Sequence, residues 1–255
     1  MTHIIVVANQ KGGVGKTTIV VHLAFHFMQK GKVCLVDLDS QGNAGGTFEG
    51  EHKSPIVASQ LFGTDLLDIP EPDGQISVIT ADGELADVEG IDIEAIQNPS
   101  KHLQGIGWAD FIIIDTPPAL GRRLLSALIA ADHVLAPIEP TGYAIDGLGD
   151  LLGTIEMVKD RFNPDLNFLG VLPNKVHAVS KNQKEFMRDL FEELEGAVIP
   201  QMLGNRVAVA DAVDTGRPVW EIMSRGGKQS GKEFKAVFRH IEERMGLIQE
   251  NKEII

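Results

Sequence analysis

The sequence predicts an α/β fold in which a doubly wound, mostly parallel sheet is flanked by helices on both faces. Three observations lead to this prediction. Short apolar runs recur along the chain, segments with helical spacing separate them, and the run at 110–115 (DFIIID) is almost uninterrupted in its apolar character. Such a run is typical of a strand covered on both faces, and strands that alternate with helices form parallel βαβ units.

The elements follow in a regular order. The first strand is expected at 3–8, and further strands at 32–37, 75–80, 110–115, 133–138 and 168–173. Helical spacing is found at 17–29, 121–131, 141–161, 181–194 and 228–245. The segment 40–108 is acidic and rich in glycine and proline, which favours loops and short elements around its one predicted strand.

Length and composition indicate a single domain over residues 1–255. The chain is 43% hydrophobic, enough to bury a good core, and it shows no repeat or clear linker. The first strand begins so early that no additional N-terminal module is expected. There is no apolar run of about 18 residues and no signal-peptide pattern, so we expect neither a membrane span nor secretion. The one cysteine, Cys34, excludes a disulfide framework and suits a reducing compartment.

Charge is distributed unevenly. The net charge of −13 by itself argues against a nucleic-acid partner. However, residues 49–94 hold twelve acids and one base, whereas residues 200–245 hold eight bases and six acids. The total therefore hides a locally basic C-terminal third.

A glycine-rich loop follows the first predicted strand. Residues 11–18 read KGGVGKTT, between an apolar strand and a helical pattern. The glycines allow the backbone N–H groups to face phosphate oxygens, and the start of the following helix favours the same anion. Lys16 is placed to reach the β- and γ-phosphates, and Thr17 offers a hydroxyl to Mg²⁺. The expected nucleotide-binding residues here are Lys11, Gly12, Gly13, Val14, Gly15, Lys16, Thr17 and Thr18.

The loop departs from the usual G-x-x-x-x-G-K-[ST] pattern, because Asn9 and Gln10 are not glycine and Lys11 precedes the glycines. In this form it resembles the deviant Walker A motif of the ParA/MinD superfamily, and the resemblance extends from His3 to about Met245. It implies a P-loop NTPase fold, ATP and Mg²⁺ as cofactors, and ATP hydrolysis. In that superfamily the first lysine crosses a dimer interface to the partner's phosphates. By resemblance, Lys11 and Lys16 are catalytic, and ATP binding is linked to homodimerisation.

Two aspartates end the second predicted strand. Asp37-Leu38-Asp39 leads into SQGN at 40–43, which resembles the D-x-D-P-Q-G-N signature of ParA proteins with Ser40 in place of proline. Carboxylates at the C-terminal edge of parallel strands face the ligand crevice. By resemblance, Asp39 lies at the metal site and orients or deprotonates the attacking water, while Asp37 is structural. A capped turn after the strand is the alternative interpretation.

A third aspartate, Asp115, ends FIIID and precedes Thr-Pro-Pro at 116–118. Four apolar residues followed by an acid form a Walker B pattern, which places the carboxylate near Mg²⁺. The prolines resemble the second switch of the same superfamily. A simple cap on the next helix is the alternative.

Two further positions match places where family members contact adenine. Asn174 ends the last predicted strand, and Pro200 follows Val198-Ile199. By resemblance both bind the nucleotide, although a plain turn role explains either position equally well.

The basic C-terminal third suggests what the nucleotide controls. ParA-type proteins bind DNA without sequence specificity as ATP dimers and release it after an adaptor of ParB type stimulates hydrolysis. By resemblance, Arg206 contacts DNA. The stretch 224–232 has flexible glycines and three bases, Arg225, Lys228 and Lys232, which suit phosphate contacts without sequence readout, and Lys235 is a further candidate. An ordinary solvated helix start is the alternative. The expected location is cytoplasmic and nucleoid-associated, and the cargo is left open among plasmid, chromosome and protein assembly.

Two other classes of function compete with this interpretation. A MinD-like membrane-positioning ATPase would need a basic amphipathic C-terminal helix, but residues 246–255 carry two acids and one base, so no membrane partner is expected. An ATP-dependent enzyme or metal chaperone sharing the loop would need a ligand cluster, and none is evident.

Overall fold

A single parallel sheet forms the centre of the computed structural model, which describes residues 2–48, 52–141, 144–177 and 181–249. The strand order is β3-β2-β4-β1-β5-β6, and each neighbouring pair is parallel. The strands are β1 His3–Val7, β2 Val33–Asp37, β3 Ile76–Ile79, β4 Phe111–Asp115, β5 His133–Ile138 and β6 Asn167–Pro173. The prediction of a doubly wound sheet is confirmed, with the described strands all parallel rather than mostly so.

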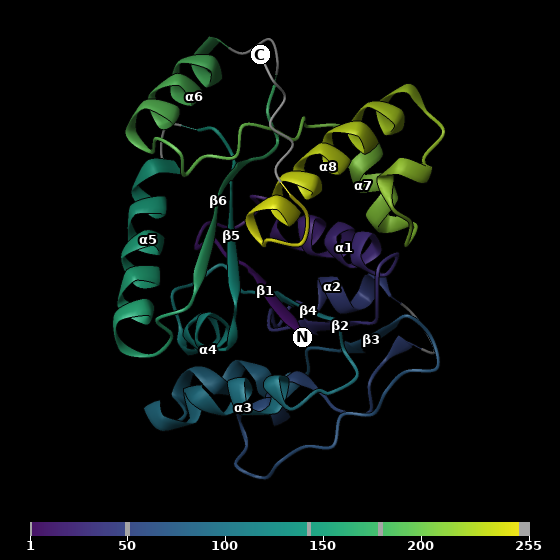
Figure 1. The fold of residues 1–255 in the computed structure, drawn as a ribbon, viewed down its shortest axis with the longest axis vertical. Coiled ribbons are helices and arrows are strands. Elements are labelled where there is room, and N and C mark those ends of the chain that lie inside the picture. The colour runs from purple at the N-terminus through teal and green to yellow at the C-terminus, as the bar shows by residue number, and fades with distance from the viewer. Residues whose placement is uncertain (1, 49–51, 142–143, 178–180, 250–255) are drawn as a thin grey trace.

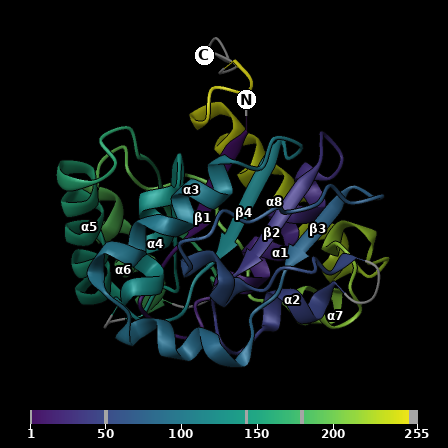
Figure 2. The same cartoon turned by 90° about the horizontal axis from the view of Figure 1, so that it is seen from below.

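Helices cover both faces of this sheet. They are α1 Lys16–Phe27, α2 Asn43–Thr47, α3 Asn98–Gln104, α4 Arg122–Ala130, α5 Ala144–Arg161, α6 Lys181–Glu193, α7 Val207–Asp214 and α8 Arg225–Arg244. Figures 1 and 2 show α1 and α8 on one side of the sheet and α4 and α5 on the other. This is the two-sided covering that parallel sheets require.

The two cores follow from the alternation of side chains along each strand. Ile5 and Val7 pack with α1 and α8, while Ile4 and Val6 pack with α4 and α5. Successive strand residues point to opposite faces, so an apolar run fills both cores at once. Helix α8 contributes Phe234, Val237, Phe238 and Ile241, which recur at helical spacing and are fully or almost fully buried.

The acidic segment 40–108 contains short elements, as predicted. Among the described residues of this segment, α2, β3 and α3 are accompanied by 3₁₀ helices at Ala58–Phe62, Gly83–Gly90 and Ile93–Gln97. These pack Leu61, Leu85 and Ile96 against the face covered by α4. The low helix propensity of the segment is therefore compensated by a few anchored apolar side chains.

The region after β6 differs from the prediction in two ways. Helix α7 was not predicted, and α8 begins at Arg225 rather than at residue 228. The stretch 224–232, predicted to be flexible, is instead the capped start of α8, because the Ser224 hydroxyl accepts a hydrogen bond from Gly227 N at 3.0 Å. Its glycines serve close packing: a Cβ on Gly227 would lie 2.2 Å from the Ile222 carbonyl oxygen.

The sequence led us to expect neither a membrane-spanning helix nor membrane binding by residues 246–255. In the described part of the chain, no helix combines the length and apolar character needed to cross a bilayer. The charged residues of the segment 246–255 lie at 250–253, outside the described residues, so the expectation that this segment does not bind a membrane stays a prediction.

Candidate nucleotide site and basic surface

The glycine-rich loop connects β1 to α1 at the C-terminal edge of the sheet. Gly13 and Gly15 have φ values of 78° and 91°, which only glycine adopts without strain. Gly15 caps α1 without a side-chain hydrogen bond, so the first backbone N–H groups of α1 have no side-chain acceptor. The loop thus has the form of an anion site at a helix N-terminus.

A cavity of about 290 Å³ lies directly over this loop. It is lined by residues that are far apart in the sequence, namely Gly12, Gly13, Gly15, Lys16, Thr17, Thr18, Asp39, Gln41, Asn43, Pro118 and Lys175. Most of the predicted phosphate-binding residues therefore share one cavity with Asp39. Val14 is buried and does not line the cavity.

Lys16 lines the cavity, whereas Asp115 does not line it and is connected to it through the lining residue Thr17. The Lys16 side chain is buried, which lowers its pKa, while the nearby carboxylates of Asp115 and Asp39 act in the opposite direction. Asp115 is fully buried, which raises its pKa to about 7. The Thr17 hydroxyl donates to Asp115 Oδ2 at 2.7 Å. A hydroxyl and a carboxylate are thus side by side, a pair of the hard oxygen ligands that Mg²⁺ prefers.

The Asp37 carboxylate organises the segment that carries Asp39. It accepts hydrogen bonds from Gly45 N at 2.8 Å and from Asp39 N at 3.1 Å, and burial raises its pKa to about 6. Asp37 and Asp115 are register partners at the ends of β2 and β4. Asp37 therefore fixes the backbone of residues 39 and 45 through hydrogen bonds, whereas Asp39 lines the cavity.

Lys11 is directed away from the phosphate cavity of its own chain. Its Nζ donates to the Thr141 hydroxyl at 2.8 Å, beyond the end of β5, and Lys11 is not among the residues that line the cavity. Its backbone N–H is held by Asn9 Oδ1 at 2.8 Å. The Lys11 ammonium group therefore lies outside the phosphate cavity of its own chain.

The end of β6 also contacts the loop. Asn174 Nδ2 donates to the Val14 carbonyl at 2.7 Å, and Lys175 Nζ donates to the Gly13 carbonyl at 2.5 Å. Sequence reasoning missed Lys175, although its position after a parallel strand was the signal that could have found it. A second cavity of about 220 Å³ continues from here past Thr18 to Gly204, Asn205 and Arg206.

Pro200 is not part of either cavity. It is exposed, and the chain returns to the nucleotide side only at Gly204–Arg206. The bridge between Val171 and Val198 holds the chain alongside β6 just before this proline, which leaves Pro200 on the outside. The nucleotide contact of Pro200 therefore stays a prediction, and residues 204–206 line the second cavity.

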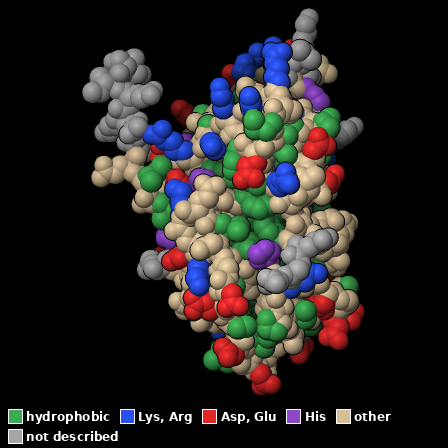
Figure 3. Space-filling model, turned by 90° about the vertical axis from the view of Figure 1, so that its right-hand side faces the viewer, with side chains coloured by type: hydrophobic (Ala, Val, Ile, Leu, Met, Phe, Trp, Pro, Cys, Tyr) green, Lys and Arg blue, Asp and Glu red, His purple; other side chains and the backbone are tan. Residues whose placement is uncertain are grey.

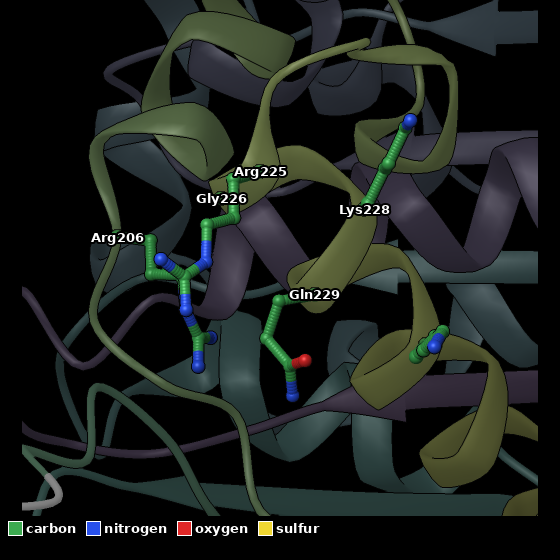
Figure 4. A pocket seen from close by; sticks show the side chains of 6 residues that line it. Arg206, Arg225, Gly226, Lys228 and Gln229 are labelled. Carbon is green, nitrogen blue, oxygen red and sulfur yellow. The ribbon is translucent and has the colours of Figure 1, made fainter.

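The predicted basic residues gather around a hollow of about 750 Å³. Arg206, Arg225, Lys228 and Lys232 line it together with Gly226 and Gln229. Figure 4 shows Arg206 and Gln229 extending the same way, with Lys228 pointing away from both. In Figure 3, Lys and Arg side chains concentrate in the upper part of this side of the molecule and Asp and Glu in the lower part. Lys235 is exposed but does not line the hollow.

Arg206 differs from its neighbours because it is already paired. Its guanidinium forms an ion pair with Glu233, and Gln229 Nε2 also donates to that carboxylate at 3.0 Å. Burial alone would raise the pKa of Glu233, but these hydrogen bonds hold it below its usual value. Arg225, Lys228 and Lys232 are exposed. The charge available in the hollow therefore comes mainly from α8.

A parallel sheet with a glycine-rich loop after β1 and a buried carboxylate at the end of β4 defines a P-loop NTPase. The family model AAA_31, described as an AAA domain, matches residues 2–168. Protein IncC of Escherichia coli is 36% identical over 96% of this chain and 70% of its own length. The chromosome partitioning protein ParA of Myxococcus xanthus is 30% identical over 88% of this chain and 83% of its own. The chain belongs to the ParA family of partitioning ATPases.

Solved structures agree with this fold. A Mycobacterium smegmatis protein described as cobyrinic acid a,c-diamide synthase, with bound ATP analogue and magnesium, has a TM-score of 0.73 at 27% identity, covering 94% of this chain and 96% of its own. A variant of Cyanothece McdA in complex with ATP has a TM-score of 0.82 at 21% identity, covering 98% and 99%.

Proposed function

We propose that this protein is an ATP-dependent dimeric switch that hydrolyses ATP and, in its ATP state, binds DNA without sequence specificity in order to partition or position a cargo. The observation that carries the proposal is the shared cavity over the glycine-rich loop, which holds Lys16, Thr17 and Asp39 together. Partitioning relatives and a solved neighbour described with an ATP analogue and magnesium support it.

We assign the roles at the site from this geometry together with the family resemblance. Lys16 and the N–H groups at the start of α1 would bind the phosphates, and Thr17 and Asp115 would hold Mg²⁺. The metal neutralises charge on the phosphates when bound. Asp39 orients or deprotonates the attacking water. Asn174 and the segment 204–206 line the second cavity, which we assign to the base side of the nucleotide.

Lys11 completes the site of a second subunit. Because its ammonium lies outside its own cavity, a partner across the nucleotide face is the recipient that fits. A cation supplied in this way is worth roughly 10³–10⁵ in rate in phosphoryl transfer. Dimerisation and ATP binding are then thermodynamically linked.

DNA is the partner that best fits the hollow between Arg206 and the start of α8. Arg225, Lys228 and Lys232 offer cations without an array of groups suited to reading base edges, and the first turn of α8 adds its positive end. In a dimer, the two subunits would bring two such basic hollows to one DNA-binding surface. The same proposal includes a cytoplasmic, nucleoid-associated location and a ParB-type adaptor that stimulates hydrolysis. It also includes a single domain over residues 1–255.

Co-sedimentation tests the proposal against its membrane alternative. The protein is mixed with random-sequence DNA or with anionic phosphatidylglycerol vesicles, each with ATP, ADP or no nucleotide and at several salt concentrations. We expect pelleting with DNA only in ATP and a steep loss with salt. Binding to vesicles in ATP, or DNA binding that ignores nucleotide, would contradict it.

A further inference from the structure

The first turn of α4 carries a buried arginine that the nucleotide site does not use directly. Arg123 is 8% exposed. Its Nη1 donates to the carbonyl of Leu38 at 3.2 Å, and its Nε donates to Glu89 Oε1 at 2.8 Å. A guanidinium is costly to bury unless it is paired, so both contacts are expected to be maintained.

The Leu38 carbonyl belongs to the peptide that leads into Asp39. The other side of the same peptide is also held, because Asp39 N donates to Asp37 Oδ1 at 3.1 Å. A peptide unit is planar, so fixing its oxygen and its N–H fixes the orientation of the whole unit. The backbone from which the Asp39 side chain projects is thereby clamped from two directions.

Glu89 holds the arginine from a third segment. Its Oε2 accepts a hydrogen bond from Arg122 N at 2.7 Å, which supplies the cap that Gly121 lacks at the start of α4. A Cβ on Gly121 would lie 2.2 Å from this carboxylate oxygen, so the close approach depends on glycine at that position. Glu89 thus fixes Arg123 to the helix that follows Asp115 and Thr-Pro-Pro.

We propose that Arg123, paired with Glu89, is a positioning residue for hydrolysis that sets the Asp39 carboxylate toward the attacking water. It ties the loop after β2, which carries Asp39, to the helix after β4, which follows Asp115. This inference rests on the proposed function, in particular on Asp39 acting in ATP hydrolysis. It predicts an effect on turnover rather than on nucleotide affinity, because neither side chain lines the phosphate cavity.

The first test is the kinetics of Arg123→Leu. We expect kcat for ATP to fall about 10- to 100-fold, as for displacement of a catalytic group by about 1 Å, with the Kd for a fluorescent ATP analogue changed less than about twofold. Arg123→Lys should recover part of the loss because it keeps one donor. Arg122→Ala is the matched control: its guanidinium bonds the Glu89 carbonyl at 2.9 Å but not Leu38, so kcat should stay near wild type.

A double-mutant cycle with Asp39→Ala separates positioning from a general structural effect. If Arg123 acts through Asp39, Arg123→Leu adds little further loss in the Asp39→Ala background. The proposal would be overturned if the losses of kcat in the two single variants added fully in the double variant. It would also be overturned if Arg123→Leu kept the wild-type kcat while Asp39→Ala was slow. Wild-type kcat in Asp39→Ala would instead contradict the proposed role of Asp39 itself, which distinguishes the two failures.

Folding is monitored through urea unfolding midpoints. If Arg123→Leu is not folded, Glu89→Gln replaces it in the same cycle, since it keeps an acceptor oxygen but removes the charge that fixes the arginine. Its kcat should fall several-fold with ATP-analogue affinity retained, and unchanged kcat in folded Glu89→Gln and folded Arg123→Lys would overturn the proposal.

Discussion

Asn174 and Val14 are 160 residues apart in the chain, yet the Asn174 side-chain amide donates to the Val14 carbonyl at 2.7 Å. The bond is buried and joins the end of β6 to the glycine-rich loop. A Cβ on Gly15 would lie 2.4 Å from the same amide nitrogen, so the loop and the asparagine are fitted to each other. The shape of the phosphate cradle therefore depends on a residue outside its motif.

Replacing Asn174 with alanine should weaken ATP binding about three- to tenfold, because a buried hydrogen bond worth about 1 kcal/mol is lost and the Val14 carbonyl is left unpaired. Titration of a fluorescent ATP analogue measures the effect. Asn167→Ala, at the opposite end of β6, removes a bond to the Arg244 carbonyl and should leave affinity unchanged. Equal affinity in the two variants would contradict a role for Asn174 in shaping the loop.

Lys11→Ala should retain ATP binding but lose turnover by roughly 10³-fold or more. Thr141→Ala, which removes only the hydroxyl that holds the lysine, should keep turnover. Mixing Lys11→Ala with Asp39→Ala decides whether the lysine acts in trans. In the mixed dimer one site has both Lys11 from its partner and its own Asp39, so ATPase activity should reappear. An inactive mixture would argue that Lys11 acts only within its own chain.

The ion pair between Arg206 and Glu233 gives opposite predictions for DNA binding. Glu233→Gln weakens the hold on Arg206 and should raise affinity for random-sequence DNA, with a salt slope steeper by about 1. Arg206→Glu should lower affinity while ATPase activity without DNA persists. Arg239→Glu, on an exposed part of α8 outside the hollow, is the control. Fluorescence anisotropy across a salt series checks all three, and equal slopes would exclude Arg206 from the interface.

His22 should make the fold sensitive to acid. Burial lowers its pKa to about 4, and its ring accepts a hydrogen bond from Val219 N at 3.2 Å. The unfolded chain takes up this proton near pH 6.5. Stability is therefore fully present above pH 6.5 and is lost as the pH falls toward 4, by up to about 3 kcal/mol.

His22→Asn tests this coupling through urea midpoints at pH 7.5, 6 and 5. The variant should be less stable than wild type at pH 7.5 but should lose less stability on acidification. Part of the slope will remain, because burial also lowers the pKa of His133 to about 4. Parallel pH curves for the two proteins would show that His22 does not contribute.

Local patterns determined most of the architecture. The apolar runs at 110–115 and 133–138 could be recognised because a strand buried on both faces excludes polar residues, and they became β4 and β5. The glycine loop was recognisable because its glycines and lysines are contiguous in the chain, and Asp115 because it directly follows an apolar strand. Helix α7 was missed because its apolar stretch is short. The start of α8 was missed because its glycines suggested a flexible loop, whereas in the structure Gly227 packs closely against Ile222.

By itself, then, the sequence determined a parallel α/β fold with a phosphate loop carrying Lys11 and Lys16, because those features are written in contiguous residues. Only the tertiary structure decided that Lys11 lies outside its own cavity, that Lys175 enters it, that Pro200 does not, and that Arg206 is paired with Glu233. It also brought Arg123 to the peptide before Asp39. These relationships join residues that are distant in sequence, and their geometry is set by how the strands and helices pack.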